Sequence, residues 1–319
     1  MRYSQLTFFF LLAWGAVAAA QPYPSKPIRM LIGFPPGGGA DIVARQITPR
    51  LGEQLGQQVV IDNRGGASGN IALGMLATAV PDGYSLMLTT PTLTVNPALY
   101  PNVGYDSLKD FAPVRLIAST AYILVVYPSV PAKSVQELVA LAKAKPRQLN
   151  YSSGGNGAAA HLAGALFGSM TGADIVHIPY KGIGPALVAL LGGEVQLTFS
   201  SQPSTIPHIK EGRLRPLGIT SAKRSSFTPD IPTIAESGVP GYETTAWYGV
   251  IAPAGTPALV IARLNLELTK LLDQTEIKAA IAAQSFEIMP SDPRQFGGFI
   301  KTELVKWTKV VKDSGMRIE

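Results

Sequence analysis

A succession of apolar strand, glycine-rich loop and helix occurs twice along the chain and limits its fold more than any other feature of the sequence. The first runs from apolar residues 28–33 through Phe34-Pro-Pro-Gly-Gly-Gly39 into a segment whose apolar residues recur at helical spacing. The second runs from residues 149–151 through Ser152-Ser-Gly-Gly-Asn-Gly157 into a helical pattern over 158–170. Strands that alternate with helices form parallel sheets with helices on their faces. The sequence therefore predicts an α/β fold.

The remaining patterns extend this alternation over the whole chain. Pro49 lies inside the first helical pattern and is expected to kink or divide that helix. The apolar run 121–127 is long enough for a strand that crosses between two domains. With 319 residues, the chain has the length of about two domains of roughly 150 residues each. Further strands are predicted at 59–61, 84–89, 174–178, 195–199, 214–219 and 247–252, and further helices at 135–145, 185–191, 259–273, 276–284 and 293–314.

The first twenty residues have the pattern of a secretory signal peptide. Arg2 precedes an apolar run from Leu6 to Ala20. This run ends in three alanines, and a signal peptidase requires such small residues before its cleavage site. The run is shorter than the roughly 20 residues that span a bilayer, although an N-terminal membrane anchor is the alternative. We therefore expect cleavage near Ala20 and export of the mature chain to the periplasm.

Composition excludes several classes of site. The chain has no cysteine, which excludes disulfides, thiolate nucleophiles and cysteine-ligated metals. The three histidines have no spacing typical of a metal site, so no metal is expected. The net charge is +6, but the basic residues are scattered, whereas a nucleic-acid-binding protein clusters them on one face. A hydrophobic content of 46% excludes an intrinsically disordered chain.

Signatures of catalysis and of cofactor binding are weak. The chain has no nucleophile elbow and no phosphate-binding Walker loop. Gly155-Asn-Gly-Ala-Ala-Ala160 fits a dinucleotide-binding pattern, which makes a dehydrogenase a rival interpretation. That pattern also requires an acidic residue where the next strand ends, and Asp174 stands where the next predicted strand begins. We therefore expect neither a nicotinamide cofactor nor an enzyme.

The glycine-rich loops themselves favour anion binding. A loop without bulky side chains before a helix exposes backbone N–H groups and the positive end of the helix dipole. Neither loop contains lysine or arginine, so each would hold a carboxylate through its backbone. The alternative is that the glycines only permit tight turns. Because both loops follow strands, they lie at the edge where α/β proteins bind ligands, and two loops could hold the two ends of a small dicarboxylate.

Several longer motifs closely resemble those of the periplasmic receptors of tripartite tricarboxylate transporters, the Bug receptors. The resemblance extends over essentially the whole mature chain. Its motifs are Phe34-Pro-Pro-Gly-Gly-Gly-Ala-Asp-Ile-Val-Ala-Arg45, Asn63-Arg-Gly-Gly66, Asp82-Gly-Tyr84, Leu108-Lys-Asp-Phe-Ala-Pro113, His177-Ile-Pro-Tyr-Lys-Gly182, Gly212-Arg-Leu-Arg215, Pro229-Asp-Ile-Pro-Thr233 and Ala252-Pro-Ala-Gly-Thr-Pro257.

The resemblance implies a two-domain Venus-flytrap fold in which each domain has a mainly parallel sheet flanked by helices. The domains would comprise residues 23–123 with 247–319, and residues 124–246, and two strands, 122–127 and 247–252, would cross between them. It further implies a small carboxylate ligand, inner-membrane permease subunits as partners, and a monomeric receptor.

The resemblance also implies which residues contact the ligand, mostly through backbone groups, small polar side chains and bridging water. Asp41 is included with its loop, but we expect it to organise the loop as an N-cap, because a free carboxylate would repel an anion. Arg45 and Arg64 are expected to be surface or ion-paired residues. The implied contacts are Phe34, Pro35, Gly37, Gly38, Gly39, Asp41, Thr89 and Thr90 in the first domain, and Ser152, Ser153, Asn156, His161, Tyr180 and Ser200 in the second.

The main hypothesis is thus a non-catalytic solute receptor that serves a transporter. One alternative is a periplasmic sensor subunit that presents its bound solute to a membrane signalling protein. Another is a periplasmic hydrolase, for which the sequence offers no catalytic base beside a nucleophile.

Overall fold

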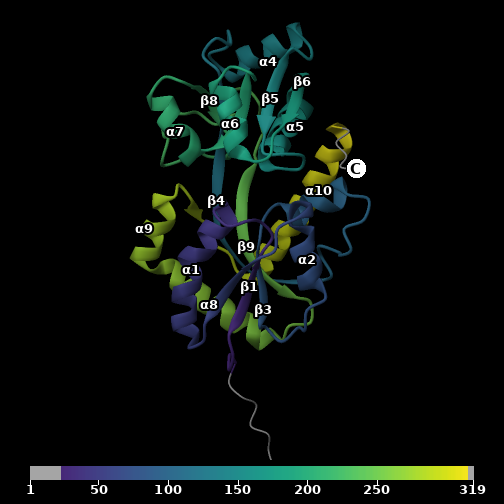
Figure 1. Ribbon diagram of the computed structural model, residues 1–319, viewed down its shortest axis with the longest axis vertical. Helices are drawn as coiled ribbons and strands as arrows, with labels where there is room; N and C mark the ends of the chain where they lie inside the picture. The colour runs from purple at the N-terminus through teal and green to yellow at the C-terminus, as the bar shows by residue number, and fades with distance from the viewer. Residues whose placement is uncertain (1–22, 315–319) are drawn as a thin grey trace, which may run out of the picture.

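Strand β4 (Phe111–Val126) passes through both lobes of the molecule (Figure 1). The computed structural model describes residues 23–314, so the predicted signal peptide lies outside the described residues. Up to Ala121, β4 pairs antiparallel with β9 (Thr245–Pro253) in the first lobe. From Tyr122 onward it pairs with β7 (Leu197–Ser201) in the second lobe. One continuous strand therefore joins the two sheets.

The first lobe contains the start of the described chain and most of the C-terminal helices. Its sheet has the order β2-β1-β3-β9-β4, in which β1 (Ile28–Ile32) is parallel to β2 (Val59–Asn63) and to β3 (Ser85–Thr89). The short strand β10 (Glu287–Ile288) pairs with β4. The helices of this lobe are α1 (Gly39–Leu55), η1 (Ala67–Gly69), α2 (Asn70–Ala77), α3 (Thr92–Leu99), α8 (Ala258–Asp273), α9 (Thr275–Ala283) and α10 (Pro293–Ser314).

The second lobe repeats this layered arrangement on a smaller scale. Strand β5 (Leu149–Ser153) lies between β6 (Ile175–Pro179) and β7 and is parallel to both, and β8 (Arg215–Ile219) pairs with β4. The helices here are α4 (Val135–Ala144), α5 (Ala159–Thr171), α6 (Ile183–Leu191) and α7 (Gln202–Lys210). Each lobe thus has parallel strands extended by an antiparallel strand, β9 in the first lobe and β4 in the second, which confirms the predicted α/β fold.

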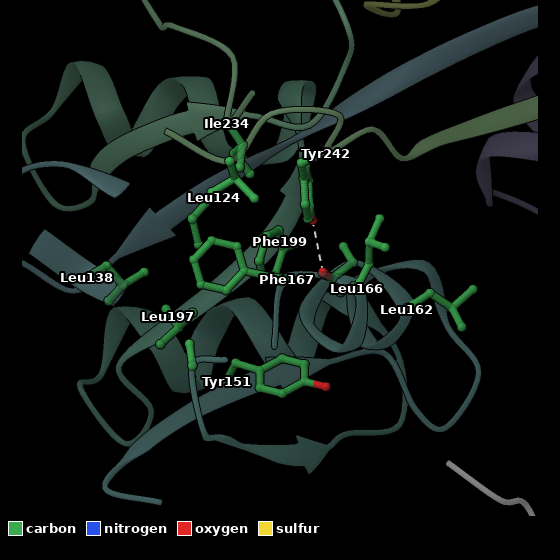
Figure 2. Packing of buried hydrophobic residues seen from close by; sticks show 14 of the residues in the cluster. Leu124, Leu138, Tyr151, Leu162, Leu166, Phe167, Leu197, Phe199, Ile234 and Tyr242 are labelled. Carbon is green, nitrogen blue, oxygen red and sulfur yellow. Dashed lines mark hydrogen bonds between the residues drawn. The ribbon is translucent and has the colours of Figure 1, made fainter. Parts of the chain in front are cut away.

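The core of the second lobe also includes part of α10. Phe167 packs against Phe199 and against the edge of Tyr242, whose hydroxyl donates to the carbonyl of Ala163 at 2.9 Å (Figure 2). Trp307 from the last turns of α10 belongs to the same cluster of buried side chains. This helix (yellow in Figure 1) begins in the first lobe and extends to the second, so it connects the lobes in addition to the strands.

The structure differs from the sequence-based expectations mainly where proline occurs. Helix α1 runs through Pro49 without being divided, because the proline lies on the exposed face, where water can satisfy the freed carbonyl. Helices α3 and α7 were not predicted; α3 contains Pro97, and α7 contains Pro203 near its start and Pro207 inside it. Pro203 is tolerated because the first N–H groups of a helix have no intrahelical partner, whereas Pro97 and Pro207 lie further along these short helices.

The strands β4 and β9 contain nearly all of the expected ranges 122–127 and 247–252 but extend beyond them. The sequence predicted a strand at 121–127, but β4 begins at Phe111 and accommodates Pro113 and Arg115 through an irregular register with β9. Strand β9 itself pairs only within the first lobe. The second link between lobes lies just before it, where the N–H of Thr244 donates to the carbonyl of Thr220. No helix within residues 23–314 combines the length and the apolar character that crossing a membrane requires.

Candidate functional site: a cleft between the lobes

A cleft of about 590 Å³ lies between the two lobes. It is bordered by the loops that follow β1 and β3 on one side, and by those that follow β5 and β6 on the other. Strand β4, which joins the lobes, and strand β9 of the first lobe also contribute to it. The lining residues are Phe34–Ala40, Ser68, Thr90–Thr92, Tyr122, Gly154, Asn156–Ala159, Leu162, Gly182, Ile183, Ala246 and Tyr248.

Four helices begin at the cleft, two from each lobe. In the first lobe Gly39 starts α1 and Thr92 starts α3, and in the second Ala159 starts α5 and Ile183 starts α6. The first N–H groups of a helix have no intrahelical partner and carry its positive dipole end. No lysine, arginine, histidine, aspartate or glutamate is among the lining residues. The cleft is therefore suited to hold anions without a charged side chain.

Asp41 holds the first-lobe loop from behind. The N–H of Gly37 donates to Asp41 Oδ2 at 3.0 Å, and Asn63 Nδ2 donates both to Asp41 Oδ1 and to the carbonyl of Phe34. The hydrogen bond from Arg45 is the main cause that lowers the pKa of the Asp41 carboxyl. Asp41 is buried and does not line the cleft.

The expected N-cap assignment for Asp41 was wrong, whereas the expected loop-organising role agrees with these contacts. The residue that caps α1 is Gly38, and Asp41 is the third residue of the helix. Arg45 pairs with Asp41 and Arg64 with Asp62, both at 2.8 Å, and neither arginine lines the cleft.

Ser153 and His161 hold the second-lobe loop in a similar way. The N–H of Gly157 donates to His161 Nδ1 at 3.0 Å, and the N–H of Gly155 donates to Ser153 Oγ at 3.1 Å. Burial and the neighbouring His177 lower the pKa of His161 to about 3, and burial lowers the pKa of His177 to about 4. Both rings are therefore neutral near pH 7. Neither Ser153 nor His161 lines the cleft.

The other expected contacts divide into two groups. Thr89, Ser152 and Ser200 are fully buried and do not line the cleft, and the hydroxyl of Ser152 donates to the carbonyl of Ala186. Tyr180 is half-buried and also lies outside the lining. That these four contact a ligand stays a prediction. The residues that the structure does bring together at the cleft are Phe34, Pro35, Gly37, Gly38, Gly39, Thr90 and Asn156.

Two tyrosines at the cleft were missed from the sequence. Tyr122 of β4 and Tyr248 of β9 both line it. Burial raises the pKa of both phenols above their ordinary value, so both keep their protons. Neither hydroxyl is hydrogen-bonded to another residue of the described part, which leaves both free to donate to a ligand oxygen. The available signal was their position: Tyr122 lies where β4 enters the second lobe, and Tyr248 lies near the start of β9, close to the second link between the lobes.

Ser68 was missed as well, and it lies in a strained turn. Four consecutive residues from Gly66 to Gly69 have positive φ, including Ala67 at 46° and Ser68 at 53°. The buried side chain of Asn96 donates to the carbonyl of Ser68, and Tyr100 donates to its hydroxyl. Such strain in non-glycine residues is concentrated at functional sites. In the sequence, Gly65, Gly66 and Gly69 surround this residue, but no ligand contact was expected here.

The features of other site classes do not form. Asp174 precedes the first residue of β6, so no acidic residue stands where a dinucleotide-binding site requires it at the end of that strand. Within residues 23–314, no three histidine, aspartate or glutamate side chains group together as metal ligands would.

Comparisons with known proteins agree with this geometry. Residues 43–316 match the protein family described as the tripartite tricarboxylate transporter family receptor. BugT of Bordetella pertussis is 38% identical over 306 residues, which cover 95% of this chain and 94% of BugT.

Solved structures extend the likeness to three dimensions. R. palustris Rpa4515 with adipate is 38% identical with a TM-score of 0.82, over 93% of this chain and 100% of that chain. MatC from Rhodopseudomonas palustris with bound malate is 30% identical with a TM-score of 0.78, over 91% of this chain and 100% of that chain. On the strength of its two-lobed fold, its uncharged cleft and these matches, the chain belongs to the receptor family of the tripartite tricarboxylate transporters, whose members are periplasmic solute-binding proteins.

Proposed function

We propose that this protein binds an aliphatic dicarboxylate in the cleft between its lobes and delivers it to the permease of a tripartite tricarboxylate transporter. The observation that carries the proposal is the meeting of four helix N-termini, two from each lobe, in a cleft without charged side chains. A dicarboxylate would place one carboxylate against the N-termini of α1 and α3, and the other against those of α5 and α6.

The middle of the cleft suits an aliphatic spacer. Phe34 from the first lobe, Leu162 and Ile183 from the second, and Ala246 from β9 present apolar surface between the two anion-binding ends. The hydroxyls of Tyr122 and Tyr248 would donate to ligand oxygens where β4 and β9 border the cleft. The relatives support this ligand class, because Rpa4515 was solved with adipate and MatC with malate, both dicarboxylates.

Delivery requires export and a change of shape. We propose that the signal peptide is cleaved near Ala20 and that the monomeric receptor acts in the periplasm with inner-membrane permease subunits. Two lobes joined by crossing strands can close on a ligand by a hinge rotation. We expect adipate to reduce the radius of gyration measured by small-angle X-ray scattering.

Calorimetric titration with a ligand series tests the binding proposal. Dicarboxylates with spacers of two to four methylene groups, from succinate to adipate, are compared with hexanoate, which lacks one carboxylate, and with adipamide, which has no charge. We expect at least one dicarboxylate to bind, hexanoate to bind at least about tenfold more weakly, and adipamide not to bind. Equal binding of adipate and adipamide would contradict an anion site.

A transport assay separates the receptor from the sensor alternative. Uptake of the labelled dicarboxylate is measured in cells that lack this protein and in cells to which it has been returned. A receptor predicts that uptake is lost and then restored. Unchanged uptake in cells that lack a protein shown to bind the dicarboxylate would favour sensing.

A further inference from the structure

The two glycine-rich loops, residues 34–39 and 152–157, are each held by a hydrogen bond of the same geometry, but the acceptor group differs. In each loop a glycine with positive φ precedes the helix cap, and its N–H donates to the side chain four residues later, on the third residue of the helix. In the first lobe Gly37 donates to Asp41 Oδ2, and in the second Gly157 donates to His161 Nδ1. The acceptor is therefore a carboxylate in one lobe and an imidazole in the other.

This hydrogen bond fixes the tautomer of His161. Because Nδ1 accepts the N–H of Gly157 at 3.0 Å, Nδ1 must carry a lone pair, and the proton of the neutral ring lies on Nε2. Gly157 has φ of +73° and lies in a turn closed by the N–H of Ala158 and the carbonyl of Gly155. Loss of the acceptor would leave the buried Gly157 N–H unpaired and release this turn.

His177 extends the support to the other end of the loop. Its ring stacks on that of His161 with centroids 3.8 Å apart and planes within 8°. Its Nε2 lies 2.6 Å from Ser153 Oγ, which in turn bonds both the N–H and the carbonyl of Gly155. The ring of Tyr151 lies 5.0 Å from that of His177, and its hydroxyl donates to the carbonyl of His161. The stacked pair thus holds the loop at two points: His161 accepts the N–H of Gly157, and His177 acts on Gly155 through Ser153.

Both histidines face away from the ligand cleft. They line a separate cavity of about 320 Å³ behind the loop, together with Tyr151, Asp174 and Asp313. Asp313 of α10 is ion-paired with Lys309. Across the described residues, no cation faces His161 in the way that Arg45 faces Asp41.

We propose that His161 is a positioning residue that fixes the second-lobe glycine-rich loop as a neutral acceptor, so that this lobe needs no buried carboxylate behind its ligand site. The proposal rests on the proposed function in assuming an anionic ligand. In the first lobe the charge of Asp41 is balanced by Arg45 one helical turn later, whereas the corresponding residue of α5 is Ala165. A carboxylate at position 161 would therefore stand uncompensated behind the anion site and repel the ligand.

Four variants separate the acceptor, the charge and the ring. His161→Asn keeps a neutral acceptor at the position of Nδ1, and His161→Phe keeps a ring without an acceptor. His161→Asp keeps the acceptor but adds a charge, and combining it with Ala165→Arg reproduces the Asp41–Arg45 pair of the first lobe. Adipate affinity is measured by calorimetry on the predicted mature chain from Gln21 onward.

We expect His161→Asn to stay within about threefold of the unmodified protein, and His161→Phe and His161→Asp each to bind at least about tenfold more weakly. Adding Ala165→Arg should recover most of the loss caused by His161→Asp. The proposal is overturned if folded His161→Phe binds adipate as tightly as His161→Asn, or if His161→Asp binds as the unmodified protein does.

A second measurement needs no ligand and keeps the two proposals distinguishable. Nitrogen-15 NMR reports which imidazole nitrogen of His161 carries the proton, and hydrogen exchange reports protection of the Gly157 amide. We expect the proton on Nε2 and a protected amide that loses protection in His161→Phe. A proton on Nδ1, or an unprotected Gly157 amide, overturns the positioning role even if adipate binds. If no dicarboxylate binds but tautomer and protection are as expected, the ligand assignment fails and the positioning role stands.

Discussion

The hydroxyl of Tyr248 lies so close to Gly39 that a β-carbon on this glycine would be only 2.2 Å from it. Gly39 begins α1 at the cleft, and Tyr248 comes from strand β9 of the same lobe. The close approach brings the phenol against the first turn of the helix that would bind a carboxylate. Glycine at position 39 is thus required by a tertiary contact and not by its backbone conformation.

Adding a methyl group at Gly39 should therefore destabilise the protein far more than adding one at Gly38. A β-carbon at Gly38 would meet only the carbonyl of Pro35, at 3.7 Å. We expect Gly39→Ala to lower the free energy of unfolding by about 1–3 kcal/mol through overpacking, and Gly38→Ala to change it by under about 0.5 kcal/mol. Urea denaturation measures both. Removing the hydroxyl with Tyr248→Phe should recover part of the loss in Gly39→Ala; equal stability of the two alanine variants would contradict the contact.

Neither arginine near the first loop should be essential for binding. Arg45 and Arg64 are about half exposed, each pairs with an aspartate, and neither lines the cleft. We expect Arg45→Ala and Arg64→Ala each to weaken adipate binding less than about tenfold, or roughly 1.4 kcal/mol. Arg45→Ala should have the larger effect, because it leaves Asp41 unpaired behind the loop. Calorimetry on both variants decides this, and abolished binding in Arg64→Ala would place the anion site elsewhere.

Stability should fall as the pH drops below about 6.5. His161 and His177 have pKa values lowered to about 3 and about 4 in the folded protein from the ordinary value of 6.5, so the unfolded chain binds more protons between these values. The stabilisation is complete above the unfolded pKa and is lost as the pH falls through the folded pKa values.

The pH range from about 5 to 6.5 isolates this effect, because carboxyl groups scarcely titrate there. Denaturant unfolding at several pH values in this range should give a smaller slope of unfolding free energy against pH in His161→Asn than in the unmodified protein. Identical slopes in the two proteins would show that the pKa of His161 is not lowered by folding.

Glu303 should stabilise the connection that α10 makes between the lobes. Its Oε2 accepts the indole N–H of Trp247 at 3.4 Å and that of Trp307 at 2.9 Å, and all three residues are buried. Glu303→Leu leaves two buried donors unpaired, so we expect it to lower the free energy of unfolding by about 2 kcal/mol or more. Glu303→Gln retains an acceptor oxygen and should cost less.

The indoles of Trp247 and Trp307 allow the unfolding of both Glu303 variants to be followed by fluorescence. The remaining tryptophan of the chain is Trp14, within the predicted signal peptide, so intrinsic fluorescence of the mature protein reports on Trp247 and Trp307. Urea unfolding followed by this fluorescence compares the two Glu303 variants. A leucine variant as stable as the glutamine variant would show that the shared carboxylate does not support the helix.

The sequence by itself determined the alternation of strands and helices, the two glycine-rich loops before α1 and α5, and the family. These are local properties. The periodicity of apolar side chains predicts a helix or a strand, and consecutive glycines predict a loop whose backbone N–H groups are not covered by side chains. The loops at Phe34–Gly39 and Asn156 accordingly line the cleft as expected. The sequence did not indicate α3, because Pro97 and its threonines suggest a loop, although Thr92 brings a helix start to the site.

Only the tertiary structure decided which polar side chains face the ligand. Ser152 and His161 lie within or next to a glycine-rich loop. Even so, the hydroxyl of Ser152 donates to the carbonyl of Ala186, and the ring of His161 accepts the N–H of Gly157 on the side of the loop away from the cleft. Tyr122 and Tyr248, which belong to neither loop, line the cleft because β4 and β9 border it where the lobes meet. The direction of a polar side chain depends on the groups, often distant in sequence, with which it forms hydrogen bonds and packs in the folded protein. Local periodicity carries no information about those partners.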